Sequence, residues 1–306
     1  DNFTCKDVVE TFMVMSKLGL TRAPLLRRLC QLTFQGLKLG RFSTRQLVVV
    51  LYALARLRFL SARDVGDVLE VLMPDLGRLT DLFVSQLVFA IGMVGGDRHL
   101  DIARLLILQY VEGNDGTKNM ASDIDVCWAV CALGLASRYR DEVDTIIARV
   151  ASCAIPTSQE LLLKLHDVIG AVDVAFQLQP ISLPSAWRTA CSEAMQREMD
   201  RIKSSRWHND VANHLHDLHL MSPRARIDPL HVCINQKLGP CHVDFMDTAT
   251  QLVVDLDMVS WPASRHIRHR ILKDMDYRPI SLEFWDWHAI QSSAGRGSFL
   301  AHKVAK

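Results

Sequence analysis

QLVVVLYALARLRF, residues 46–59, decides the fold, because similar text recurs at a regular interval through the first half of the chain. The copies begin at Asp7, Gln46, Gln86 and Asp125, with a weaker fifth copy at Asp167. Their spacings are 39, 40, 39 and 42 residues. Each copy opens with Asp or Gln and continues as an almost unbroken apolar run. A fixed period of this length indicates a repeat architecture.

The segments between the copies have a different pattern. Residues 62–76, 100–111 and 140–152 place apolar residues at i, i+3, i+4 and i+7, with charges on the opposite face, which is typical of an amphipathic helix. One apolar inner helix covered by one amphipathic helix is the unit of a solenoid. We therefore expect a mainly α chain whose residues 1–180 form an α-solenoid of about five helix pairs. Ser43-Thr44 and Ser122-Asp123 are predicted to cap inner helices.

Composition narrows the class of protein. The chain has 306 residues, of which 49% are hydrophobic and 23% charged, as expected of a globular protein. No apolar run reaches the roughly 18 residues that span a bilayer, so we expect no membrane segment. Eight cysteines without CxxC spacing favour reduced thiols in a reducing compartment over a disulfide or metal framework.

The charge distribution favours the C-terminal third as the place for an anionic partner. The net charge of the whole chain is only +1. Residues 201–306, however, hold 14 Lys and Arg against 11 Asp and Glu, and ten of the twelve histidines. Such an asymmetry predicts where an anion would be attracted, although it is mild.

A change of pattern follows the repeats. QLQPISLPSAW, residues 177–187, contains two prolines and marks a boundary. Residues 186–205 and 205–221 then have the pattern of two bridging helices, within a segment 181–221. From His231 the sequence has the alternating pattern of β-strands, which predicts a small α+β module over residues 222–306. Its expected strands are 231–234, 241–247, 251–259 and 278–287, the last running into a Trp-rich turn, and its expected helix is 261–275.

The C-terminal module resembles a RAP domain, a short module of organellar RNA-binding proteins. The resemblance is carried by Val243-Asp244-Phe245, by LVVDLD at 252–257, by RHRILK at 268–273 and by FWDW at 284–287. SRWHNDVANHLHDLHL, residues 205–220, is similar to the helix that introduces that domain. With its helical repeats, the whole chain is similar to FAST-kinase-like or octotricopeptide-like organellar proteins. The resemblance implies a degenerate restriction-endonuclease-like core and an RNA ligand.

Cations on one helix, bracketed by flat aromatic side chains, are the ingredients of RNA recognition. The predicted RNA contacts are Arg265, Arg268, His269, Arg270, Lys273, Arg278 and Trp261. Tyr277, Trp285 and Trp287 are predicted to be structural anchors that hold this surface in place.

The related nuclease core makes an enzyme the rival hypothesis. Asp244, Asp255 and Asp257 would be its carboxylates, holding Mg²⁺ for phosphodiester attack. Asp257, however, occupies the position where such enzymes carry a lysine. The Gly-Pro-Ser-His turn of the RAP family is replaced by Met-Val-Ser-Trp at 258–261. We therefore expect no catalysis, no metal, no cofactor and no small-molecule substrate.

The expected function is non-catalytic RNA binding, as an rRNA-binding structural component of a divergent mitochondrial ribosome. Its partners would be rRNA and ribosomal or other ribonucleoprotein proteins, and its location the mitochondrial matrix, favoured over the plastid. A trans-acting factor for mitochondrial RNA processing or stability is the alternative within the same class. A protein-only adaptor that uses the solenoid groove is a third possibility.

Overall fold

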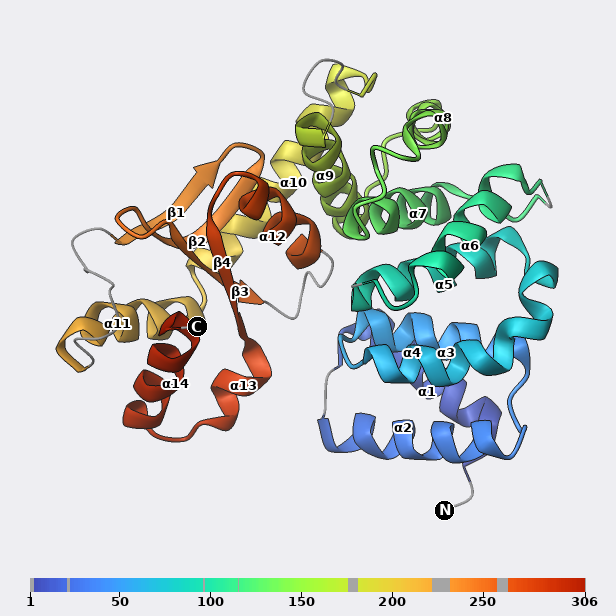
Figure 1. The fold of residues 1–306 in the computed structure, drawn as a ribbon, viewed down its shortest axis with the longest axis horizontal. Coiled ribbons are helices and arrows are strands. Elements are labelled where there is room, and N and C mark those ends of the chain that lie inside the picture. Colours follow the sequence, from blue (N-terminus) through green and yellow to red (C-terminus); the bar gives the residue numbers. More distant parts are fainter. Residues whose placement is uncertain are drawn as a thin grey trace. The chain divides into compact units, whose positions relative to one another are not determined.

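The computed structural model describes residues 3–20, 23–95, 97–114, 116–175, 181–221, 232–257 and 264–305. These residues are mainly helical, with a small four-stranded sheet towards the C-terminal end (Figure 1). That is the coarse class predicted from the sequence. Two compact units are present: Asp1–Thr157 with Leu178–Pro184, and Ser158–Gln177 with Ser185–Lys306. None of the helices in the described ranges has the length and apolarity to cross a bilayer.

The first unit consists of helices that follow one another from blue to green in Figure 1. The first four repeat copies fall in α1, α3, α5 and α7, and the segments between them in α4, α6 and α8, so the helical interpretation of both patterns is confirmed. Helix α1 packs on α3, α3 on α5, and α5 on α7, while each even-numbered helix packs on the one before it. The elements are α1 Cys5–Leu18, α2 Ala23–Lys38, α3 Thr44–Arg56, α4 Ala62–Leu72, the 3-10 helix η1 Met73–Arg78, α5 Asp81–Val94, α6 Leu100–Glu112, α7 Met120–Ala132 and α8 Arg140–Ala151.

Capping side chains set where the inner helices begin. Ser43 caps α3 in a capping box with Gln46, which confirms that predicted cap. The prediction for α7 was wrong, because its cap is Asn119, and Ser122 is the third residue of the helix. The Asn119 side chain accepts from the Ser122 backbone N–H, and the Ser122 hydroxyl oxygen accepts from the Asn119 backbone N–H, so α7 begins about one turn earlier than predicted.

A close approach joins α5 and α7 in the middle of the first unit. A Cβ built on Gly92 would lie 2.9 Å from the Cβ of Ala129, so only glycine lets the two helices come so near. Trp128 is fully buried beside this contact, and its ring lies 5.2 Å from that of Phe89. The almost unbroken apolar sequence of the repeats is therefore explained by inner helices that pack against other helices on several sides.

The second unit begins with three helices, α9 Gln159–Ala175, α10 Ser185–Lys203 and α11 Arg206–Met221. The sequence grouped the fifth repeat copy, in α9, with the solenoid of residues 1–180. In the structure α9 belongs with the sheet, because it packs on α10 and on α12. Gly170 of α9 meets Pro240 closely, since a Cβ there would lie 3.0 Å from the proline ring.

The sheet has the strand order β1-β2-β3-β4. Antiparallel pairing joins β1 to β2 and β2 to β3, whereas β4 runs parallel to β3. A parallel pair needs a crossover connection, and α12 lies in that connection. The elements are β1 Val232–Leu238, β2 Cys241–Asp247, β3 Leu252–Asp257, α12 Ser264–Asp274, β4 Arg278–Glu283, α13 Phe284–Ala289 and α14 Ser293–Ala305.

The Trp-rich segment differs from its prediction. It was expected to be the end of a strand and a turn, but β4 ends at Glu283 and residues 284–289 form the short helix α13. The helix turns Trp287 into the core, where its side chain is fully buried. No element was predicted for residues 293–305, which form α14 and pack on α11.

Both faces of the sheet are covered. One face carries Phe245, Val254 and Leu282, which form a hydrophobic core with side chains of α11, α13 and α14. The other face is opposite α12, which contacts β2 and β4. Because successive side chains of a strand alternate between faces, Asp244 and Asp255 lie on the α12 side.

Candidate functional site

A buried cluster of charges lies between β2, β3 and α12. The register that pairs Phe245 with Val254 continues to Asp244 opposite Asp255, and both carboxyls are almost completely buried. The Arg268 guanidinium of α12 lies 2.9 Å from Asp255 Oδ2 and also donates to the His242 carbonyl at 3.3 Å. The backbone N–H of Leu256 donates to Asp244 Oδ2 at 2.7 Å.

Arg268 thus pairs with Asp255 and acts on Asp244 through the field of its charge alone. Burial and the neighbouring charge of Asp255 raise the pKa of Asp244 to about 8, against the opposing effect of Arg268. A hydrogen bond with Asp255 raises the pKa of Asp244 further, which favours the protonated form of this carboxyl. Among the residues that the structure describes, none hydrogen-bonds the buried Asp255 Oδ1 or Arg268 Nε. The described cationic partners of Asp255 therefore lie at its Oδ2 atom.

The predicted carboxylate set is brought together in part. Asp244 and Asp255 are neighbours, and the Asp257 backbone follows on β3, paired in register with Glu283. The side chain of Asp257 lies outside the described residues. Among the side chains that the structure describes, no three His, Cys, Asp or Glu residues are grouped so as to hold a metal.

The predicted RNA contacts fall into three groups. Trp261 and the side chain of Arg265 lie outside the described residues. Arg268, expected on the surface, is held in the ion pair with Asp255, because α12 turns it towards the sheet. His269 Nε2 lies 3.2 Å from Ser281 Oγ and 3.8 Å from Asp255, so it too faces the strands.

The remaining predicted contacts face outwards. Lys273 and Arg278 are exposed, at the end of α12 and the start of β4, and Arg270 is half-buried. Arg270 and Lys273 are three residues apart on the helix, so they share a face. Tyr277 is half-buried beside them. Two exposed cations, Lys273 and Arg278, thus lie where α12 ends and β4 begins, alternating along the chain with the exposed carboxylates of Asp274 and Asp276.

The predicted anchor Trp287 has partners that the sequence did not reveal. Its Nε1–H donates to Asp210 Oδ2 of α11 at 2.8 Å. Arg296 of α14 donates to the same oxygen at 2.8 Å and lies over the indole ring, 5.7 Å from its centroid. His214 meets the ring edge-on at 5.2 Å. Three distant helices are joined at this carboxylate; the side chain of Trp285 lies outside the described residues.

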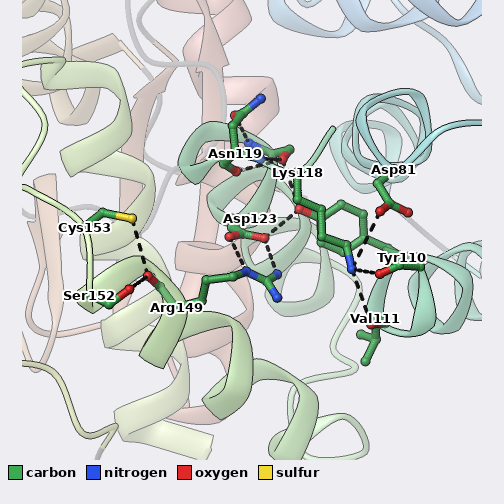
Figure 2. A network of polar contacts seen from close by, with 11 residues as sticks. Asp81, Tyr110, Val111, Lys118, Asn119, Asp123, Arg149, Ser152 and Cys153 are labelled. Atoms are coloured by element: carbon green, nitrogen blue, oxygen red, sulfur yellow. Dashed lines mark hydrogen bonds and ion pairs between the residues drawn. The ribbon is translucent and has the colours of Figure 1, made fainter. Parts of the chain in front are cut away.

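A second buried charge centre, in the first unit, was not predicted (Figure 2). Arg149 Nε donates to Asp123 Oδ2 at 2.8 Å, and the Tyr110 hydroxyl donates to Asp123 Oδ1 at 2.6 Å. Beside it, Lys118 lies 3.8 Å from Asp81 and 5.0 Å from the Tyr110 ring centroid. Lys118 also donates to the Gly113 carbonyl. These contacts join α5, α6, α7 and α8.

Comparison with known proteins adds no relative. No protein-family model matches the chain, and the search of curated proteins finds no match.

Proposed function

We propose that the chain is a non-catalytic RNA-binding protein, an α-solenoid of helix pairs followed by a RAP-like module with a degenerate nuclease core. Its role would be that of an rRNA-binding structural component of a mitochondrial ribosome, in the matrix, held by rRNA and by neighbouring ribosomal proteins. The motif resemblance of residues 205–305 supports the family, and the order of strands and helices in the second unit is compatible with it.

One observation carries the non-catalytic part of the proposal, the ion pair of Asp255 with Arg268. A metal-dependent nuclease uses its strand carboxylates to bind a divalent cation. Here a guanidinium lies 2.9 Å from Asp255 and supplies the positive charge itself. Burial and Asp255 raise the pKa of the neighbouring carboxyl, Asp244, so this group must lose a proton before it can bind a metal. This donor set suits a structural centre.

The binding part is supported by the outward-facing cations at the end of α12. Lys273 and Arg278 are exposed, and Arg270 shares the face of Lys273. Side chains of this kind neutralise phosphates, and affinity for nucleic acid follows the number of such contacts more than the net charge of the chain. A chain of net charge +1 can therefore bind RNA through a local group of cations.

The test is RNA affinity as a function of salt, for a double variant Lys273→Ala/Arg278→Ala. We expect affinity for single-stranded or rRNA-derived RNA to fall by about tenfold or more, and the salt slope to decrease by about 0.7 per lost phosphate contact. The matched control is Lys38→Ala/Arg63→Ala, which removes two exposed cations from the first unit.

The outcomes distinguish the candidate functions. An equal fall in the control pair would place the RNA contact elsewhere, and no salt dependence in the wild type would leave a protein adaptor. Cleavage of structured RNA with Mg²⁺ or Mn²⁺, lost in a folded Asp255→Asn variant, would overturn the non-catalytic function. Sedimentation of the native protein with ribosomal subunits is expected; sedimentation free of them would favour the trans-acting RNA factor.

A further inference from the structure

The exposed apolar side chains are concentrated at the α1 end of the first unit. Of the thirteen large hydrophobic residues that are exposed in the described part of the chain, seven lie within residues 3–39. They are Phe3, Met13, Val14, Leu18, Leu20, Leu25 and Leu39. A shallow hollow of about 750 Å³ runs along α1 between some of them. Clusters of this kind mark interaction surfaces.

Helix α1 contacts its described neighbours with one of its faces. Helix α3 packs on α1 with one side and on α5 with another. Helix α1 packs on α3 and on α2, and buries Val8, Phe12 and Met15. Its remaining stripe, with Phe3, Val14 and Leu18, is about half exposed or more. That stripe contains the apolar side chains of a helix–helix contact surface, and none of the described helices lies upon it.

The charges on the same stripe are arranged so that the stripe complements itself. Asp7 and Glu10 lie in the first half of α1, and Lys17 lies in its last turn. At 100° per residue these three side chains lie on the same side of the helix as Val14. An antiparallel second copy would set Lys17 of each chain beside the acidic half of the other, whereas a parallel copy would set like charges together.

The existing contacts of these charges leave room for such pairing. Glu10 lies 3.8 Å from Lys6, but the two side chains are 62% and 78% exposed, so this surface pair contributes little. Asp7 accepts the helix-capping hydrogen bond of Thr4 and keeps its negative charge. No contact in the described structure occupies the stripe at Val14.

We propose that this face of α1 is an interface between two copies of the chain, with the two α1 helices antiparallel about a twofold axis. A twofold contact uses one surface twice, so each Glu10–Lys17 pairing occurs twice. Helix α1 has 14 residues, or about 21 Å of length, which is less surface than a standard interface offers. The dimer is therefore weak, with a Kd in the range of about 10–100 μM.

The test is sedimentation equilibrium of the 306-residue chain from about 1 to 300 μM, where the wild type should change from monomer to dimer. Glu10→Lys and Lys17→Glu should each weaken dimerisation by about tenfold, since each sets like charges together. The double variant should recover most of the wild-type affinity. Leu18→Lys should abolish the dimer, and Leu105→Lys, on an equally exposed leucine of α6, should not.

Three outcomes would overturn the proposal. The first is a wild type that stays monomeric over the whole range. The second is a dimer whose Kd is unchanged by Leu18→Lys. The third is a double charge variant no better than its two single variants, which would exclude the antiparallel pairing. Circular dichroism of each variant separates loss of contact from loss of folding.

Discussion

Each of the two units has a buried aspartate paired with an arginine, but the number of carboxyls and of donors differs between the two centres. In the first unit one carboxylate, Asp123, receives Arg149 and Tyr110, and both of its oxygens have donors. In the second unit Arg268 pairs with Asp255, while the adjacent buried carboxyl of Asp244 has a backbone donor, Leu256, and feels the charge of Arg268. Arg149 is 39% exposed and can still be hydrated, whereas Arg268 is only 15% exposed.

This difference teaches how a buried charge is made tolerable. Burial of a carboxylate is costly unless it is paired and hydrogen-bonded. The cost for Asp123 is offset by the hydrogen bonds that it accepts from Arg149 and Tyr110. Asp244 meets it by keeping a proton, because burial and Asp255 raise its pKa. Because the raised pKa of Asp244 lies close to neutrality, the stability of the second centre depends on pH.

The largest expected effect comes from the same substitution in both centres. Arg268→Met leaves Asp255 buried without a cation, which should lower the free energy of unfolding of the second unit by about 3–5 kcal/mol. Arg149→Met should cost only about 1–2 kcal/mol in the first unit, because Arg149 is partly exposed and its pairing is screened by solvent.

Hydrogen exchange of peptides from β2 and β3, and from α7, measures the two losses separately. Equal losses in the two units would contradict the difference between the centres. Asp255→Asn added to Arg268→Met should restore part of the stability, because it removes the unpaired charge.

The next effect is on pH dependence. The Asp244 pKa of about 8 in the folded protein is above its ordinary value of 3.8, so the folded state keeps a proton that the unfolded state has lost. Stability should therefore fall as pH rises towards 8, at up to about 1.4 kcal/mol per pH unit. His166 acts oppositely, because burial lowers its pKa to about 4 and stability rises between pH 4 and 6.5.

The free energy of unfolding should thus fall between pH 6.5 and 8, and the substitution Asp244→Asn should remove this fall. Urea unfolding at pH 6.5, 7.2 and 8.0, on the wild type and the variant, measures the two slopes. Burial also lowers the pKa values of His208 and His242, so these groups act in the same direction as His166. Their contribution is the same in the wild type and in the variant, and it cancels in the comparison. Parallel slopes in the two proteins would show that Asp244 is ionised throughout.

The smallest effect is expected for Tyr110→Phe. The hydroxyl donates to Asp123, but Arg149 remains on that carboxylate and keeps its charge paired. Loss of one such hydrogen bond should cost about 0.5–1 kcal/mol in the first unit, less than the loss of Arg149. Exchange rates of α7 peptides measure it. A cost as large as that of Arg268→Met would mean that the tyrosine, not the arginine, holds the first centre together.

Much of the fold could be predicted from the sequence, because it depends on local pattern. Apolar text at a fixed period predicted the inner helices, and the alternation in residues 241–247 predicted β2 with its bounds. Capping was predicted at Ser43 and missed at Asn119, since several polar residues precede α7 and only the structure shows which one returns a hydrogen bond.

The arrangement of the candidate site was harder to predict from the sequence than the fold. Asp255 was considered only for the rival metal cluster and Arg268 was predicted as an RNA contact, yet the two form one ion pair. A pairing across a crossover depends on which way α12 faces, and its hydrophobic pattern is sparse. One signal was available: in a β3–α12–β4 unit the helix lies on one face of the sheet, so its inward cation can meet a strand carboxylate.

The interleaving of the second unit constrains the order in which the chain can fold during its synthesis. Helices of the first unit pack on near neighbours in sequence, so they can assemble as they emerge. Trp207 and Val211 of α11 instead share their core with Leu300 and Val304 of α14, roughly ninety residues later. Until α14 is made, that apolar face is uncovered, which exposes the nascent chain to aggregation. A chaperone acting during translation would be needed most in this interval.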